Sequence, residues 1–122
     1  AIGAGSDVGT NCLLATDSRL EIGRDVLIAA YTYLSAGGHH RYDDPHVPII
    51  RQGFISKGGV TVGDDVWIGS HCTVLDGVSI GSGSIIGAHS LVNKPVPAGM
   101  IAWGIPAEPR RERPAAAAPA NP

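Results

Sequence analysis

The sequence predicts an all-β protein wound as a solenoid, in which short strands alternate with corners. One observation is a six-residue spacing of Ile, Leu or Val along most of the chain. A second is that the residues one and four places after each such position are nearly always small. A third is composition, because 17 glycines and only two Trp, three Tyr and one Phe in 122 residues leave few rings to fill a conventional core. We therefore expect a narrow interior of aliphatic side chains.

The large aliphatic positions, called anchors here, fall into two blocks separated by a long interruption. They are Ile2, Val8, Leu14, Ile22, Ile28, Leu34, Val62, Ile68, Val74, Ile80, Ile86 and Val92. An α-helix repeats its apolar residues at spacings of three and four, and an antiparallel strand alternates by two, so neither explains a spacing of six. One strand and one corner per six residues do explain it. The anchor would point into the interior, and small residues would lie where backbones come close. Gly would supply the positive φ of the corner.

This pattern resembles the hexapeptide-repeat acyltransferases, in which three hexads form each triangular coil of a left-handed parallel β-helix. The resemblance extends from residue 1 to about residue 110, and its most typical run is VGDDVWIG at residues 62–69. Residues 2–37 and 60–94 would then form about four coils. The predicted fold class is a left-handed parallel β-helix of hexapeptide repeats with one excursion loop and a short C-terminal tail. Such a short prism exposes strand edges, and the resemblance implies a homotrimer.

Beyond the repeat, the sequence predicts one domain with one loop and one tail. We expect one domain over residues 1–110 with the loop near residues 39–59, and a disordered Pro/Ala-rich tail over residues 111–122. The chain opens at Ala1 in the middle of a repeat, so we expect a fragment or a processed product. The net charge of -2 argues against a nucleic-acid partner. The sequence has no apolar run long enough to span a bilayer and no apolar leader, which predicts a cytoplasmic protein with no membrane partner.

The excursion loop carries the residues with the clearest chemistry, including three of the five histidines. Long loops on rigid scaffolds often carry function. The spacing His40-x-Tyr42-x-Asp44-Pro45 resembles a loop motif of sugar and polysaccharide acetyltransferases, and His40-Arg41-Tyr42-Asp43 is similar to one of xenobiotic acetyltransferases. Acyl transfer from a thioester to a hydroxyl requires a base that works near neutral pH, as imidazole does.

Two neighbouring histidines are candidates for that base. The downstream Tyr, Asp and Pro favour His40. The spacing from Ile22 found in some sugar acetyltransferases would instead place the family histidine at His39. By resemblance, Tyr42 and Asp44 would bind the acceptor. Asp17 would join them or orient a histidine of a neighbouring subunit, and its alternative is a corner Asp that bonds to its own backbone.

The resemblance also implies acetyl-CoA as the acyl donor. Trp67, Gly69 and Ser70 would lie beside the pantetheine, Ala88 and Ser90 would offer backbone groups along it, and Lys94 would approach the phosphates. Further along the chain, Gly104-Ile105-Pro106-Ala107 matches a motif near the adenine. It assigns Pro106 and Ala107 to the cofactor site, with Arg110 as a phosphate ligand.

We predict structural roles for His71, His89 and the two cysteines. His71 and His89 are 18 residues apart at the same hexad position, so we expect them to stack in successive coils. The sequence offers no third histidine at a matching spacing, so no metal site is predicted. Cys12 and Cys72 occupy small inward positions and are expected to be buried free thiols.

These residues together predict an acetyl-CoA-dependent O-acetyltransferase that acts on a hydroxyl of a sugar, a saccharide or a similar small acceptor. Transfer would be direct, with a histidine general base and both substrates in a groove between neighbouring subunits. An N-acetyltransferase of an amino sugar or xenobiotic would use most of the same residues. A non-catalytic β-solenoid that serves as an assembly or binding module is the alternative from another class.

Overall fold

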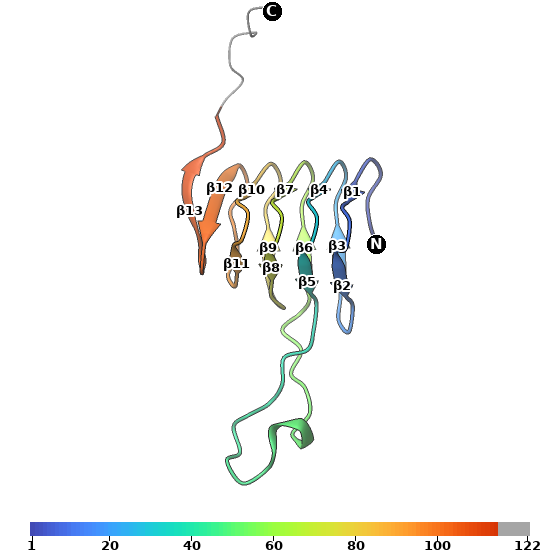
Figure 1. The fold of residues 1–122 in the computed structure, drawn as a ribbon, viewed down its shortest axis with the longest axis vertical. Helices are drawn as coiled ribbons and strands as arrows, with labels where there is room; N and C mark the ends of the chain where they lie inside the picture. Colours follow the sequence, from blue (N-terminus) through green and yellow to red (C-terminus); the bar gives the residue numbers. More distant parts are fainter. Residues whose placement is uncertain (115–122) are drawn as a thin grey trace, which may run out of the picture.

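The structure is a computed structural model that describes residues 1–114. The chain winds into the predicted left-handed parallel β-helix, with three parallel sheets as the sides of a prism (Figure 1). Face A holds β3 (Leu20–Ile22), β6 (Val60–Val62) and β9 (Ser79–Ile80). Face B holds β1 (Asp7–Val8), β4 (Leu27–Ile28), β7 (Trp67–Ile68), β10 (Ile85–Ile86) and β12 (Met100–Gly104). Face C holds β2 (Leu13–Ala15), β5 (Tyr33–Ser35), β8 (Thr73–Val74) and β11 (Leu91–Val92).

The anchors fill the interior of the prism in layers. Equivalent anchors pair directly between coils, as Ile28 does with Ile68 and Ile68 with Ile86 on face B. The nine anchors from the second coil onward are fully buried: Ile22, Ile28, Leu34, Val62, Ile68, Val74, Ile80, Ile86 and Val92. In the first coil Ile2 is 52% exposed and Val8 and Leu14 are half-buried, because they lie at the end of the stack.

The corners differ from the expectation in one respect. The positive φ lies three residues after the anchor, at positions such as Asn11 (56°), Tyr31 (62°) and His71 (56°), and the glycines directly after the anchors do not adopt it. Those glycines instead allow close packing of successive coils. A Cβ added at Gly69, for example, would lie 2.6 Å from the backbone N of Ala88. The prediction that these glycines supply positive φ was therefore wrong, and steric clearance is the reason for them.

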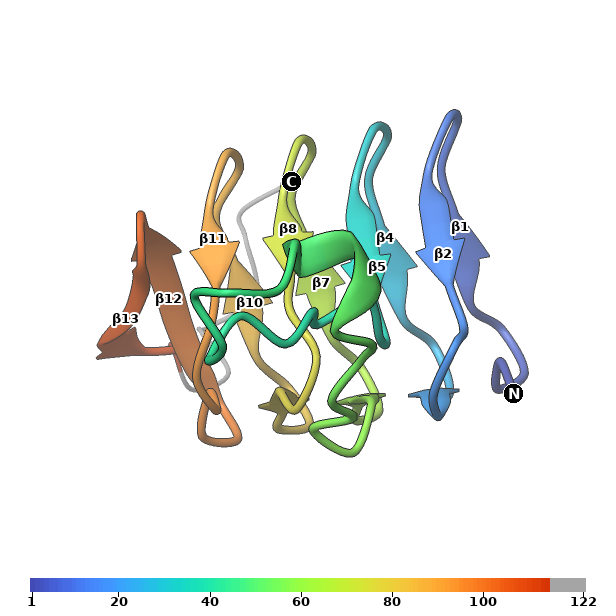
Figure 2. The ribbon, with the colours of Figure 1, turned by 90° about the horizontal axis from the view of Figure 1, so that it is seen from below.

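Departures from the six-residue spacing gather at the edge where face C turns into face A. Two extra residues separate Leu14 from Ile22 there, and the excursion between β5 and β6 leaves from the same edge one coil later. The excursion projects from the prism and contains the 3₁₀ turn η1 (Ile49–Arg51), as Figures 1 and 2 show. It runs from the end of β5 at Ser35 to the start of β6 at Val60.

The repeat continues past residue 94, where the sequence pattern was expected to end. Val96 bridges to Ile80 on face A, and Ala102 of β12 pairs with Ile86 on face B. β13 (Ala107–Glu112) then folds back antiparallel to β12, so the predicted boundary after residue 110 falls inside a strand. The rest of the predicted tail, residues 115–122, lies outside the described residues.

Candidate functional site

The two candidate bases lie in the neck of the excursion, which is a short antiparallel ribbon. The N–H of Ile55 donates to the carbonyl of His39 at 2.7 Å, and His40 forms a bridge with Phe54. Successive side chains of an extended strand point to opposite sides, so His39 and His40 do not share a side. The His40 ring lies 4.8 Å from the Phe54 ring, and His40 is exposed, whereas His39 is half-buried.

His39 lines a polar cavity of about 340 Å³ at the edge between faces C and A, called the His39 cavity here. Three of its other lining residues, Ser35, Leu75 and Asn93, directly follow the stacked face C anchors of three successive coils. The cavity is completed by Gly37, Gly38, Lys57 and Asp76. The His39 cavity therefore joins the neck of the loop to the side of the prism.

Asp76 holds the returning strand of the loop, and the sequence analysis did not single it out. Its two carboxylate oxygens accept the N–H groups of Lys57 at 2.8 Å and of Gly59 at 2.7 Å. Asp76 precedes Gly77, which has a φ of 88°. An Asp-Gly pair between two anchors is a turn signal that identifies a corner, but not the partner of the carboxylate.

A second cavity, the Asp17 cavity, shares Gly37 and Gly38 with the His39 cavity. It measures about 290 Å³, and its lining residues are Asp17, Ser18, Gly37, Gly38, Phe54, Ile55 and Ser56. The Asp17 side chain lies directly over Gly37, where an added Cβ would be 2.6 Å from the Cβ of Asp17. The hydroxyl groups of Ser18 and Ser56 are 3.2 Å apart and link the loop to the corner between β2 and β3.

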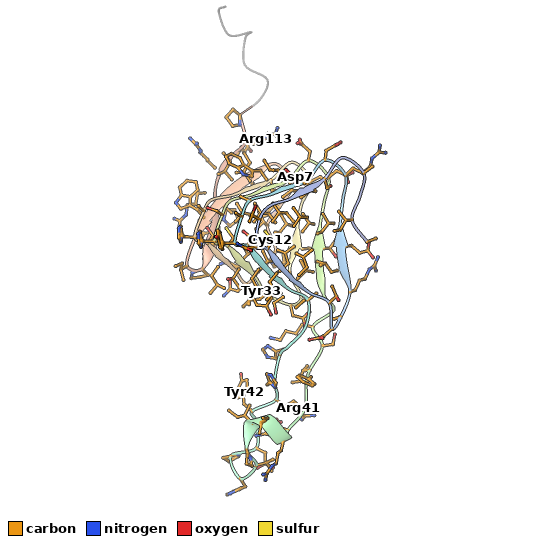
Figure 3. The ribbon with its side chains drawn as sticks, turned by 45° about the vertical axis from the view of Figure 1, so that its right-hand side comes forward. Asp7, Cys12, Tyr33, Arg41, Tyr42 and Arg113 are labelled. Atoms are coloured by element: carbon orange, nitrogen blue, oxygen red, sulfur yellow. The ribbon has the colours of Figure 1, made fainter. Side chains whose placement is uncertain are left out.

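Tyr42 and Asp44 lie farther out on the loop and are not brought to Asp17 within this chain. Tyr42 is 70% exposed, and Figure 3 shows it on the projecting segment, away from Tyr33 on the prism. Asp44 shapes the loop itself, since its Oδ1 accepts the N–H of His46 at 2.9 Å. Beside it, a hydrogen bond from Arg41 lowers the pKa of the Asp43 carboxyl.

The predicted pantetheine residues lie together at the edge between faces B and C. Gly69 and Ala88 are in contact across successive coils, and Ser70 follows Gly69 at that corner. Ser90 is buried, where its hydroxyl donates to the carbonyl of Gly87 at 2.7 Å and accepts the N–H of Gly104 at 3.1 Å.

Trp67 presents its ring on the outer side of face B and is 50% exposed. Its in-register neighbours there are Leu27 and Ile85. The ring therefore lies on face B, one strand residue before the corner that carries Gly69 and Ser70.

The residues predicted to contact the nucleotide lie at the C-terminal end of the prism. The ammonium of Lys94 pairs with Glu108 at 2.6 Å. The Nε of Arg110 donates to the carbonyl of Trp103 at 2.8 Å, with the guanidinium 5.2 Å from the centre of the indole. Ala107 is buried and Pro106 is exposed in the turn between β12 and β13.

The two groups of predicted residues therefore lie at different edges of one prism. The loop histidines lie at the edge between faces C and A, and the predicted pantetheine residues lie at the edge between faces B and C. Face C separates them. One chain does not bring a loop histidine to its own predicted thioester site.

The predicted stack of His71 and His89 is confirmed, with ring centres 4.9 Å apart and an interplanar angle of 3°. Tyr31 extends it at 5.1 Å from His71, which the sequence analysis missed although Tyr31 also lies three residues after an anchor. Within residues 1–114, no group of three or more His, Cys, Asp or Glu side chains is arranged to hold a metal ion.

Both cysteines are free, but only Cys72 is buried as predicted. Its Sγ donates to the carbonyl of Gly87 at 3.1 Å, and burial raises the pKa of the thiol. Cys12 is only half-buried, so the prediction of a buried thiol was wrong there, because Cys12 belongs to the end coil. In the part of the chain that the structure describes, no helix has the length and apolarity needed to cross a membrane.

Comparison with known proteins agrees with the repeat and the fold. Residues 59–94 match the family model "Bacterial transferase hexapeptide (six repeats)". The chain is 38% identical to the galactoside O-acetyltransferase of Escherichia coli K12 over 102 residues, which are 84% of this chain and 48% of that protein. The hexapeptide-repeat acetyltransferase VCA0836 from Vibrio cholerae superposes with a TM-score of 0.82 at 28% identity, covering 93% of this chain and 62% of that one.

A second solved structure is the polySia specific acetyltransferase NeuO, with a TM-score of 0.76 and 31% identity over 97% of this chain and 54% of that one. The chain spans about a third to a half of the length of the first curated relatives that it matches. What it shares with the two solved structures is the fold. In its repeat, its fold and these likenesses, the chain is similar to the hexapeptide-repeat acetyltransferases, among them proteins named as sugar O-acetyltransferases.

Proposed function

We propose that this protein transfers the acetyl group of acetyl-CoA to a hydroxyl of a sugar or saccharide, with His39 as the general base. The observation that carries the assignment is the position of His39, half-buried in a polar cavity between the loop and the prism. The sequence motif favoured His40, whose exposed ring is engaged with Phe54 on the other side of the ribbon. The geometry therefore supports His39 better than His40.

The reaction is direct transfer without an acyl-enzyme. The His39 imidazole accepts the proton of the acceptor hydroxyl as its oxygen attacks the carbonyl carbon of the thioester. The tetrahedral intermediate then breaks its C–S bond, and the imidazolium returns the proton to the departing thiolate. The products are an acetyl ester and free CoA, so atoms and charge balance with a single proton carrier.

The donor is proposed to bind along the edge between faces B and C. At that corner Gly69 packs closely against Ala88 of the next coil, Ser70 and the exposed Ala88 present small side chains, and the exposed Trp67 borders it. Lys94 and Arg110 are proposed to exchange their present partners, Glu108 and the Trp103 carbonyl, for the phosphates. Both are exposed side chains, so the exchange costs little.

The complete site is proposed to form between copies of the chain in a homotrimer. The projecting loop of one copy would bring His39 to the edge between faces B and C of its neighbour. Asp17 is proposed to bind the acceptor beside His39, and Tyr42 and Asp44 are proposed to reach it across the same seam. The large exposed apolar side chains of the loop, including Ile50 at 85%, support burial of this segment against another copy.

The test is release of CoA from acetyl-CoA in the presence of a sugar panel, corrected for hydrolysis, with three alanine variants. We expect His39→Ala to lower the rate by about 10²- to 10⁴-fold, the range for loss of a general base. His40→Ala should lower it much less. His46→Ala is the matched control, because His46 is an exposed loop histidine that lines neither the His39 cavity nor the Asp17 cavity.

Two results would count against the proposal. If His40→Ala removed activity and His39→Ala did not, the base would be the other neighbour. If neither substitution changed the rate of CoA release, a mechanism with a loop histidine as general base would be excluded.

A further inference from the structure

The His39 cavity is lined by a positively charged side chain that the proposed mechanism does not use. This side chain is Lys57, on the returning strand of the loop. We propose that Lys57 and Asn93 bind an anionic group of the acceptor, so that the preferred acceptor is an acidic sugar and not a neutral one. This inference rests on the proposed function and adds to it the charge of the acceptor.

The backbone of Lys57 is fixed to the prism, which determines where its side chain begins. Its N–H donates to Oδ2 of Asp76 at 2.8 Å. Its Cβ and its carbonyl oxygen lie against Gly77, where an added Cβ would be 3.0 Å from each of them. A bound anion would therefore be held at a defined place relative to the His39 imidazole. Preorganisation of this kind improves binding by reducing the ordering that the ligand must impose.

The charge of Lys57 is not neutralised within the described chain. In residues 1–114 its ammonium forms no ion pair, whereas the other lysine, Lys94, pairs with Glu108. Asp76 lines the same cavity, but its two carboxylate oxygens already accept the N–H groups of Lys57 and Gly59. An ammonium in a polar cavity without a carboxylate partner favours an anionic ligand.

Asn93 supplies a second donor for the anion. It directly follows the anchor Val92, at the position where Gly63, Gly69 and Gly81 follow theirs. Asn93 lines the cavity, and its amide group has two N–H donors. One ammonium and one amide can together donate to both oxygens of a carboxylate.

The anionic group is assigned to the acceptor and not to the donor. The phosphates of acetyl-CoA are proposed to lie at Lys94 and Arg110, and its thioester end is uncharged. The cavity of about 340 Å³ is suited to a single ring. The reacting hydroxyl and the anionic group would then belong to one sugar unit, with the anion toward Lys57 and away from Asp17, which does not line this cavity.

The experiment compares each acidic sugar with its own methyl ester, which has the same hydroxyl groups and no charge. It measures kcat/KM for acetylation by the full chain, with the methyl glycosides of galacturonic, glucuronic and N-acetylneuraminic acid as acceptors. We expect the unmodified protein to prefer at least one acid over its ester by about five- to twentyfold, the effect of a charged hydrogen bond at an accessible site. Added NaCl should reduce this preference, because salt screens the attraction.

Variants of the two side chains test the assignment. Lys57→Met removes the charge but leaves the backbone N–H that Asp76 accepts. It should abolish the preference for the acid and change kcat/KM for the ester by less than about twofold. Lys57→Arg should keep the preference. Asn93→Asp should reduce it, because a carboxylate at that position repels the anion.

Arg51→Met is the matched control, because Arg51 is an exposed cation of the same loop that lines neither the His39 cavity nor the Asp17 cavity. It should leave the preference unchanged. Sugar phosphates form a second arm, and a preference for them over the acids would support the same subsite with a phosphate ester as the anion. The thermal midpoint and oligomeric size of each variant are measured alongside.

The outcomes separate this inference from the proposed function. If no acidic or phosphorylated sugar were preferred, or if the preference survived Lys57→Met, the anion subsite would be overturned and the acetyltransferase left intact. An equal loss for acid and ester on Lys57→Met, at unchanged thermal midpoint and size, would assign Lys57 to the chemical step, and that too would overturn the subsite. Absence of transfer to every acidic, esterified and neutral sugar tested would overturn the proposed function, and the subsite with it.

Discussion

At the scale of single residues, the glycines that follow the anchors tolerate no side chain without a shift of the neighbouring coil. A Cβ at Gly9 would lie 2.8 Å from the backbone N of Ala30 and 2.9 Å from the carbonyl of Ile28, and backbone atoms cannot move aside as a side chain can. We therefore expect Gly9→Ala to cost about 1–3 kcal/mol of unfolding free energy, as overpacking does. Urea denaturation measures this, with Thr10→Ala, an exposed neighbour, as control. Equal midpoints for the two variants would contradict the steric explanation.

The two cysteines give a second residue-scale prediction, which concerns pH. Burial raises the pKa of the Cys72 thiol, so at a given alkaline pH less of it is thiolate, and the thiolate is the reactive form. Iodoacetamide should therefore alkylate Cys12 faster than Cys72 in the folded protein at pH 8. Peptide mass spectrometry reads both sites in one sample. Equal rates in the native state, or a faster Cys72, would contradict the burial described for this side chain.

The loop motif favoured His40, whereas the structure places His39 in a polar cavity and leaves the His40 ring exposed beside Phe54. The sequence does not reveal on which side of the neck ribbon each histidine points. Asp76 was missed for a related reason. Its partners, Lys57 and Gly59, are 19 and 17 residues away in the chain, and only the folded loop brings them to the carboxylate.

At the scale of elements, the excursion loop depends on Asp76, which anchors its return to the prism. Asp76→Ala removes the acceptor of two backbone N–H groups, of which that of Gly59 belongs to a buried residue. We expect a loss of about 1–3 kcal/mol of local stability, visible as faster amide exchange of residues 57–59. If the loop carries the base, kcat should fall while KM for acetyl-CoA changes little. Unchanged exchange at these amides would contradict the anchoring role.

The strands themselves were predictable, because the anchor spacing determines both the position and the register of each one. The spacing also located the excursion between Leu34 and Val62. What it missed was the last turn of the prism, since Val96 follows Val92 after only four residues and a strict count of six does not find it. The antiparallel β13 was missed as well, because AEPRRE has neither the period nor the composition of a coil.

At the scale of the whole molecule, the separation of the loop histidines from the predicted pantetheine residues is the fact that matters most. Face C lies between the two groups in one chain, and the loop carries its apolar side chains outward. Neither feature is expected of a protein that works as a monomer. The proposed trimer accounts for both, because each seam would join the loop of one copy to the donor edge of the next.

Subunit complementation tests this shared site most directly. One variant, His39→Ala, loses the base but keeps the donor edge, and another, Ala88→Trp, keeps the base but fills the donor edge at an exposed corner position. Each alone should be inactive. Coexpressed in equal amounts, they should recover about a quarter of the unmodified activity, since at each seam there is a one-in-four chance that an intact loop meets an intact edge. Mixed assemblies no more active than the separate variants would contradict a site built from two copies of the chain.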